Sequence, residues 1–421
     1  MQMRVMNQGQ RRWLGGGTLV LALVSAGQVR AEGNAFKDAL SQTKPIVDAR
    51  LRTEDVDQDP IANDANATTL RLRLGFETGK IWNTTLLVEG EGVVPLENDY
   101  RPDPMVAEKV TYPVVADPEN YEFNRLQLTN TSIPGTTLTL GRQRILLDDQ
   151  RFVGNVGWRQ NEQTFDAFRV VNKSVKNLVL DATYLDQVNR VFGRDSPQGV
   201  YEGPSVLLNA SYQTKVGKLT GFGYLLQFDN VPGVPAAVRD SSDTYGLRFT
   251  GDHAVGKVKL AYLASWATQS EAGDNPLSFD LDYEAAELMA SWKQFGFGAG
   301  IEVLEGNGVK GFTTPLATLH KFQGWADKFL TTPPNGIEDR YVTATTNLKA
   351  VGGLDTLGVV LSYHDYGAQH ISADYGSEWN ASLTAKVKKV SCMLKYADYT
   401  QGMLASARDT QKLWMQVEFV W

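Results

Sequence analysis

The sequence predicts an all-β fold, a transmembrane antiparallel up-and-down β-barrel of about 18 strands. Short segments throughout the chain alternate apolar and polar residues, which is the period of a strand with one apolar face. No run of about 18 apolar residues follows the N-terminal region, and helical membrane spans are therefore excluded. Short and long connections alternate between the segments without exception, which is typical of barrels with short periplasmic turns and long outer loops.

The N-terminus has the features of a secretory signal peptide over residues 1–31. Three arginines precede an apolar stretch at 13–27 that is too short to span a bilayer, and residues 29–31 fit a small-residue cleavage site. The alternative is a retained membrane anchor. We expect residues 32–43 to form a short polar periplasmic lead-in and residues 44–421 to form the barrel.

The charge balance excludes one broad class of function. The formal net charge is −7, from 41 basic and 48 acidic residues. Residues 1–31 carry four arginines and no acid, so the mature chain has 37 − 48 = −11. A nucleic-acid partner is not expected, because it would need a basic surface. The one cysteine, Cys392, allows no intrachain disulfide, so stability must come from other sources, and a closed barrel provides one.

The alternation places the strands and their faces. In the segment 44–55 one face carries Asp48, Arg50, Arg52 and Glu54; in 68–78 the outward face carries Leu70, Leu72, Leu74 and Phe76. We expect strands near 44–55, 68–78, 81–93, 122–132, 136–147, 164–172, 177–190, 204–215, 218–229, 243–251, 257–268, 281–292, 295–305, 340–349, 355–366, 377–387, 390–400 and 411–421.

The segment 138–170 is the most informative stretch for function. Arg142 and Arg144 are two residues apart on the strand 136–147, so period-2 geometry points both to one face. Leu138 and Leu140 share that parity, and we expect either a bulge near Gly141 or leucines that face the lumen near its base.

Arginines on the inward face of the barrel are the candidate solute-binding residues. Arginine at this density creates a selective field for anions in a pore. The alternative is that these arginines pair with Asp48, Glu54, Glu77, Glu89 and Glu91 and only brace the inner wall. The candidates are Arg50, Arg52, Arg71, Arg73, Arg125, Arg142, Arg144, Arg169 and Arg248.

The loop after the arginine strand is a candidate constriction at the outer mouth. It contains Asp148, Asp149 and Arg151, and the alternative is a solvated loop. A metal site is not expected there, because no nearby histidine or third carboxylate completes a ligand shell. His364 and Asp365 are adjacent on a strand and point to opposite faces, so no catalytic triad is indicated and neither an enzyme nor a cofactor is expected.

Aromatic residues near strand ends are expected to form an interfacial girdle against outer-membrane lipid, the alternative being the core of a soluble β-sandwich. The chain ends on Phe419 and Trp421, an alternating terminal strand that resembles the signal read by the outer-membrane assembly machinery. The loop 306–339 is expected to fold into the barrel mouth or to cap the surface, with one helical turn at residues 325–330. The girdle candidates are Tyr184, Tyr212, Trp266, Trp292, Trp379 and Trp414.

Several segments resemble the alginate export family of outer-membrane porins. They are the block 138–170, GFETG at 75–79, VEGEG at 88–92, ADPENYEFNRLQL at 116–128 and TPLATLHKFQGWADKFL at 314–330. The resemblance implies an 18-stranded barrel in the Gram-negative outer membrane that passes a polyuronate through an arginine-rich lumen.

The residues and the resemblance together predict a porin for passive, selective passage of an acidic or polar solute. An anionic oligo- or polysaccharide such as alginate is one such solute. The alternative is an outer-membrane barrel enzyme, or a structural or adhesive barrel that conducts nothing.

Overall fold

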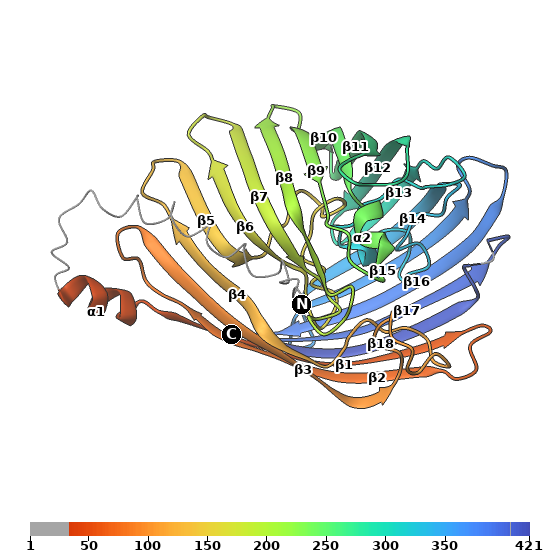
Figure 1. The fold of residues 1–421 in the computed structure, drawn as a ribbon, viewed down its shortest axis with the longest axis horizontal. Helices are drawn as coiled ribbons and strands as arrows, with labels where there is room; N and C mark the ends of the chain where they lie inside the picture. Colours follow the sequence, from red (N-terminus) through yellow and green to blue (C-terminus); the bar gives the residue numbers. More distant parts are fainter. Residues whose placement is uncertain (1–32, 405) are drawn as a thin grey trace, which may run out of the picture.

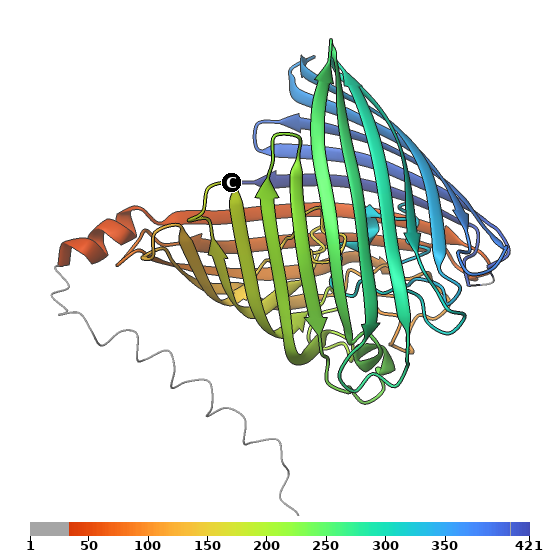
Figure 2. The same cartoon turned by 90° about the horizontal axis from the view of Figure 1, so that it is seen from above.

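A closed ring of 18 antiparallel strands forms the molecule (Figures 1 and 2). The computed structural model describes residues 33–404 and 406–421, so the expected signal peptide at 1–31 lies outside the described residues. Each strand pairs with its sequence neighbours, and β1 closes the ring by pairing with β18, where Asp48 lies opposite Val420 and Gln58 opposite Thr410. The predicted fold class is confirmed.

The strand positions agree with the alternation read from the sequence. Residues 33–41, within the expected lead-in, form the helix α1, which projects from the barrel at the start of β1 (Figure 1). The strands are β1 (Lys44–Gln58), β2 (Ala65–Glu77), β3 (Thr84–Asp99), β4 (Asn120–Asn130), β5 (Thr136–Gln143), β6 (Thr164–Asn172), β7 (Leu178–Asn189), β8 (Val200–Gln213), β9 (Lys218–Leu226), β10 (Ser242–Val255), β11 (Val258–Glu271), β12 (Asp280–Trp292), β13 (Phe295–Leu304), β14 (Ile337–Val351), β15 (Leu354–Gly367), β16 (Asp374–Val387), β17 (Val390–Gln401) and β18 (Thr410–Val420).

The connections give the barrel two different ends. The short-turn end has loops as tight as 256–257, 293–294, 352–353 and 388–389. The long-loop end carries 100–119, 144–163, 190–199, 227–241 and 305–336, with the short helix α2 (Pro235–Arg239) and the 3-10 turn η3 (Leu319–Lys321). The predicted alternation has one exception, because the connections 59–64 and 78–83 each contain six residues.

Strand alternation separates an apolar outer face from a polar inner face. On β2, Leu70, Leu72 and Leu74 are exposed whereas Arg71 and Arg73 are buried, which confirms the predicted parity. Apolar side chains on the outside match a hydrocarbon surround, and polar ones inside match a water-filled lumen. Within residues 33–404 and 406–421, no helix has the length and apolar character to cross a membrane.

One expected girdle residue lies inside the barrel instead. Trp414 is fully buried, because it shares the parity of the inward Lys412 rather than that of the exposed Met415. The other five girdle candidates are exposed on the outer face, and they are Tyr184, Tyr212, Trp266, Trp292 and Trp379.

The arginine strand also differs from the expectation. β5 ends at Gln143, so Arg144 lies beyond the strand. No register shift occurs where β5 pairs with β4 or β6, and the expected bulge near Gly141 is therefore wrong. The irregularities fall in neighbouring strands, at Glu89/Gly90 in the β3–β4 pairing and Asp166/Ala167 in the β6–β7 pairing.

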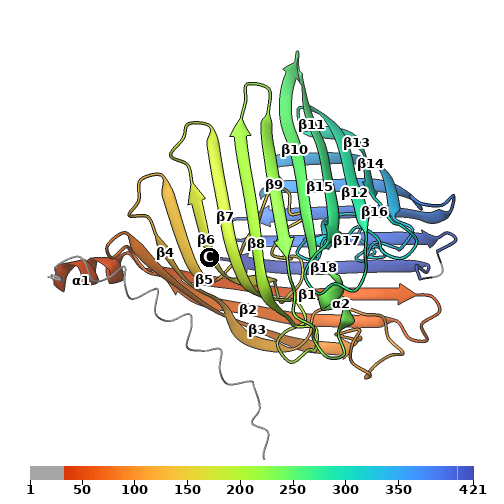
Figure 3. The same cartoon turned by 45° about the horizontal axis from the view of Figure 1, so that its top comes forward.

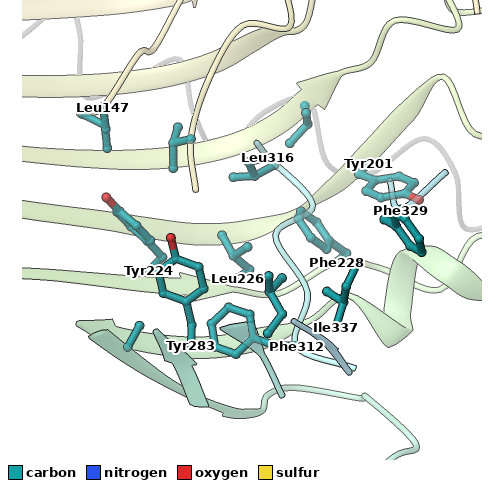
Figure 4. Packing of buried hydrophobic residues seen from close by; sticks show 14 of the residues in the cluster. Leu147, Tyr201, Tyr224, Leu226, Phe228, Tyr283, Phe312, Leu316, Phe329 and Ile337 are labelled. Atoms are coloured by element: carbon teal, nitrogen blue, oxygen red, sulfur yellow. The ribbon is translucent and has the colours of Figure 1, made fainter. Parts of the chain in front are cut away.

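The hydrophobic core of the molecule lies inside the barrel (Figure 4). Phe312 and Leu316, from the 305–336 loop, pack with inward aromatic residues of the wall such as Tyr283 and Tyr224. The ring of Phe152, from the 144–163 loop, lies 4.9 Å from that of Phe222 and 5.2 Å from that of Tyr283. Burying these rings favours the in-folded position of both loops, at roughly 25 cal/mol per Å² of apolar surface removed from water.

The outer face can be tested with one substitution. We expect Leu72→Arg to lower the free energy of unfolding by about 2–4 kcal/mol if Leu72 lies near the bilayer midplane, because a cation would face hydrocarbon. The measurement is urea unfolding in lipid vesicles. Gln127→Arg, at an inward position opposite Leu87, should cost much less; equal losses would mean that the face assignment is wrong. Gly75 is unsuitable as the inward control, because a Cβ there would lie 2.2 Å from the Val88 carbonyl oxygen.

Candidate functional site

Two long loops fold into the lumen and join to form a partition. Backbone hydrogen bonds connect them: the Gly154 amide donates to the Leu316 carbonyl at 2.8 Å, and the Thr318 amide to the Gln150 carbonyl at 3.0 Å. The Thr318 hydroxyl also accepts a hydrogen bond from the Val156 amide at 3.1 Å. Figure 3 shows the two loops within the outline of the barrel. The partition consists of the 144–163 loop and the 305–336 loop.

The barrel wall holds the partition through buried carboxylates. Glu302 on β13 accepts hydrogen bonds from Arg151 at 2.6 Å and from the Tyr283 hydroxyl at 2.8 Å. Glu378 on β16 accepts the amide of Ala326 at 2.9 Å. The 144–163 loop is therefore fixed to β13 and the 305–336 loop to β16 by charge-assisted hydrogen bonds, which are about twice as strong as neutral ones.

The predicted constriction residues lie in this partition. Asp148 pairs with Lys218 at 2.7 Å, and Asp149 pairs with Arg248 at 2.7 Å. Arg151 is buried against Glu302. The three residues thus anchor the 144–163 loop to strands β9, β10 and β13, and a freely solvated loop does not describe them.

The predicted arginines all have carboxylate neighbours within 4.0 Å. A row along β1–β4 alternates arginine and acid, for example Arg71 with Asp48 at 2.6 Å and Arg125 with Glu89 at 2.6 Å. The remaining pairs are Arg50–Glu418, Arg52–Asp117, Arg73–Glu91, Arg142–Asp166, Arg144–Glu162, Arg169–Asp181 and Arg248–Asp149. For most of the nine arginines, considered one at a time, these contacts favour a role in bracing the inner wall over a role in binding solute.

Arg142 and Arg144 do not share one face. Arg144 reaches inward to Glu162 at 2.5 Å and Glu89 at 3.5 Å, and 26% of its side chain is exposed. Arg142 has the strand parity of the exposed Leu140 and pairs with Asp166 on β6. The pair separates because β5 ends at Gln143 and the chain turns into the lumen directly afterwards.

A buried relay that the sequence did not indicate fastens the partition to β17. Asp327 contacts His320 Nδ1 at 2.7 Å, and His320 Nε2 lies 2.7 Å from Lys395 Nζ. Lys395 Nζ also lies over the rings of Trp158 at 4.1 Å and Trp325 at 3.8 Å, a cation–π arrangement. The imidazole is an acceptor toward Lys395 only while it is neutral.

The Asp327 carboxylate also pairs with two cationic side chains. Arg159 donates to its carboxylate at 3.0 Å and Lys412 at 3.1 Å. Both also contact Glu54 on β1, at 2.9 and 3.7 Å. The relay therefore joins both in-folded loops to β1, β17 and β18. The sequence, with a lone histidine and scattered lysines, gave no indication of this relay because its members are far apart in the chain; Arg159 and Asp327, for example, are separated by 168 residues.

Lowering the pH should weaken the contacts that His320 and Asp327 make in this relay. Burial lowers the pKa of His320 from 6.5 to about 3, and although burial opposes ionisation of Asp327, its His320 and Lys412 contacts hold that pKa well below the usual range. Both groups bind a proton more readily once the loop opens. The two groups therefore stabilise the in-folded position of the 305–336 loop fully at pH values above the ordinary pKa of histidine. This stabilisation is lost as the pH falls from there toward the folded-state pKa.

We expect open-channel current noise in planar bilayers to increase as the pH is lowered from neutral to about 4, because an opened His320 would be protonated there. His320→Gln keeps a neutral polar side chain and removes this titration, so its noise should change less over the same range. The same pH response in both proteins would contradict the role assigned to His320.

Within residues 33–404 and 406–421, no group of three His, Cys, Asp or Glu side chains is arranged to hold a metal ion. The site is instead a charged lumen narrowed by an internal partition, inside a closed barrel with an apolar exterior. That combination defines an outer-membrane channel.

Comparison with known proteins agrees with this class. The family model described as Alginate export matches residues 121–270, and the resemblance to alginate-export barrels is thereby confirmed. The chain is a β-barrel of the Gram-negative outer membrane, and its residues 121–270 are similar to alginate export proteins. No curated protein matches it in sequence.

Solved porin structures from Pseudomonas aeruginosa share the fold. OpdK with vanillate is 14% identical, with a TM-score of 0.68 over 91% of this chain and 99% of that one. OccK2 (OpdF) in complex with glucuronate is 14% identical, with a TM-score of 0.65 over 90% and 99%. OpdQ is 16% identical, with a TM-score of 0.66 over 91% and 99%. The matched family and these structures are export proteins and channels rather than enzymes.

Proposed function

We propose that the barrel passes anionic solutes passively and selectively. The observation that carries this proposal is the partition, which narrows the lumen beside the arginine-rich wall of β1–β5. A solute that crosses the narrowing has to pass within the field of Arg144 and Arg125, whose side chains are partly exposed. Charges of exposed groups act over roughly 8–10 Å in physiological salt, so they control passage only where a pore is narrow.

Net charge cannot account for anion preference in this protein. The mature chain expected from the sequence is acidic, at −11, so the preference would come from the local field of the lumen. Arg144 is the strongest single candidate, because it is the most exposed of the arginines that reach inward along this wall.

The partition favours small acids over a long polymer. Two loops with a buried aromatic core occupy the bore, and a polysaccharide would have to displace them. Two structurally similar porins have been solved with small carboxylates, OpdK with vanillate and OccK2 with glucuronate, and solutes of that size are consistent with the narrowed lumen. A non-conducting barrel is the second candidate, and the same partition favours it if the loops never open.

The two arginines of the GRQR segment should differ in effect. We expect Arg144→Gln to move the reversal potential in a salt gradient toward cation preference, because Glu162 and Glu89 would lose a nearby cation. Arg142→Gln should move it much less, because Arg142 pairs with Asp166 away from the inward set. The measurement uses purified protein in planar bilayers.

The wild type provides two decisive readings in that experiment. A wild-type channel that prefers cations would contradict the proposed selectivity. A folded wild-type protein that conducts no current at neutral or acidic pH would favour the non-conducting barrel instead.

A further inference from the structure

A cavity of about 420 Å³ lies at the long-loop end, against the partition. The 59–64, 100–119, 190–199 and 305–336 loops contribute to its lining, together with the 144–163 loop and the end of β18. Its volume lies within the range of small-molecule sites, about 300–1,000 Å³. Neither the family match nor the similar structures assigns a ligand to this cavity.

The ionisable lining is almost entirely cationic. Five lysine and arginine side chains line the cavity, and Asp327 is its one acid. Asp327 already contacts His320, Arg159 and Lys412, so these partners balance its negative charge. The cationic side chains are Arg101, Arg159, Arg190, Lys328 and Lys412.

Three of these cations have no carboxylate within 4.0 Å in the described part of the chain: Arg101, Arg190 and Lys328. This separates them from the arginines of the wall, which are all paired. Lys328 donates to the Thr410 hydroxyl at 2.7 Å and keeps two further N–H donors. Burial and the neighbouring Lys412 lower the pKa of Lys328 to about 8, so most of it is protonated at neutral pH.

Arg190 is held in place rather than neutralised. Its guanidinium lies 4.2 Å from the ring centroid of Tyr201 and 5.3 Å from that of Phe192, and one nitrogen donates to the Gln198 carbonyl at 3.1 Å. Its Nε and second terminal nitrogen have no hydrogen bond to the described residues. Stacking of this kind pre-orders the planar donor group for a carboxylate.

Apolar side chains from several loops make up much of the rest of the lining, which also contains the polar side chains of Gln58, Gln163, Gln198 and Thr331. Val110 and Leu330 line the cavity and have overall exposures of 57% and 43%, and Phe192 and Val191 add to the same lining. Where a sugar acid lies against these apolar side chains its hydroxyl groups would have no partners, and unpaired polar groups are costly to bury. An organic acid with an apolar body would lose little.

We propose that this cavity is a binding site for small carboxylic acids with an apolar body, which are captured at the long-loop mouth. The carboxylate would lie between Lys328 and Arg190, and the apolar body against Val110, Phe192 and Leu330. The inference rests on the proposed function, because it supplies that channel with a capture site.

Calorimetric titration of the purified protein in nanodiscs, at neutral pH, tests the proposal. The probes are cyclohexanecarboxylate, its neutral amide cyclohexanecarboxamide, glucuronate and inorganic phosphate. We expect cyclohexanecarboxylate to bind about tenfold more tightly than each of the other three, since only it combines the charge with an apolar body.

Variants locate the site. Lys328→Gln and Arg190→Gln should each weaken cyclohexanecarboxylate binding by about tenfold, through loss of a charge-assisted hydrogen bond. Lys257→Gln makes the same charge change in the exposed 256–257 turn at the other end of the barrel and should bind as the wild type does. A heat-dependent shift on gels confirms that each variant is folded, and Lys328→Gln remains informative if Arg190→Gln is not.

Two results would overturn the site. One is wild-type affinity in folded Lys328→Gln; the other is binding of glucuronate or phosphate as tight as that of cyclohexanecarboxylate. Reversal potentials measured on the same preparations separate this failure from that of the channel. Anion preference without cyclohexanecarboxylate binding rejects the capture site alone, whereas binding without anion preference rejects the proposed function.

Discussion

The absence of water from the hydrocarbon core of a bilayer is the constraint on which the rest of the structure depends. An unpaired backbone N–H or C=O costs several kcal/mol there, so a sheet can cross only if it has no edge. The β1–β18 pairing removes the edge and joins the two ends of the chain. Once the ring is closed, successive side chains of each strand point alternately to the lipid and to the lumen.

A closed ring of 18 strands encloses a wide interior that has to be filled. An empty lumen of 18 strands would be unselective, and the chain fills it in two ways. Charged side chains of the β1–β5 wall pair with one another, as in Arg71–Asp48 and Arg125–Glu89. The 144–163 and 305–336 loops bring apolar side chains such as Phe312 into the interior. The hydrophobic core is therefore inside a membrane barrel, between loops and wall.

The pairing of wall charges sets where selectivity can arise. A guanidinium with a carboxylate at 2.6 Å contributes little net field at a distance, although removing either partner leaves a buried charge uncompensated and costly. Uncompensated cations lie elsewhere, at the long-loop mouth, where Lys328 and Arg190 line the outer cavity. A solute would thus meet attraction at the mouth first and a narrow, largely balanced passage afterwards. The Asp327–His320–Lys395 relay holds that passage in its narrow form.

The sequence by itself determined the strands, their faces and the class of protein. Period-2 alternation is local, so Leu72 and Arg71 could be assigned to opposite faces from β2 alone. The segments that resemble alginate export proteins were recognisable for the same reason, because each is contiguous. Even Trp414 could have been placed inside by its neighbours on β18, since Lys412 and Met415 give the parity of that strand.

Only the tertiary structure decided which charges meet. The partners of Arg144 depend on β5 ending at Gln143, and the relay joins Asp327 to Lys395 and Arg159 from separate parts of the chain. The expected helical turn at 325–330 is absent, and the amides of Trp325 and Ala326 donate to Glu378 on the wall. Such contacts depend on how loops pack inside a closed ring, and no local period in the sequence encodes that packing.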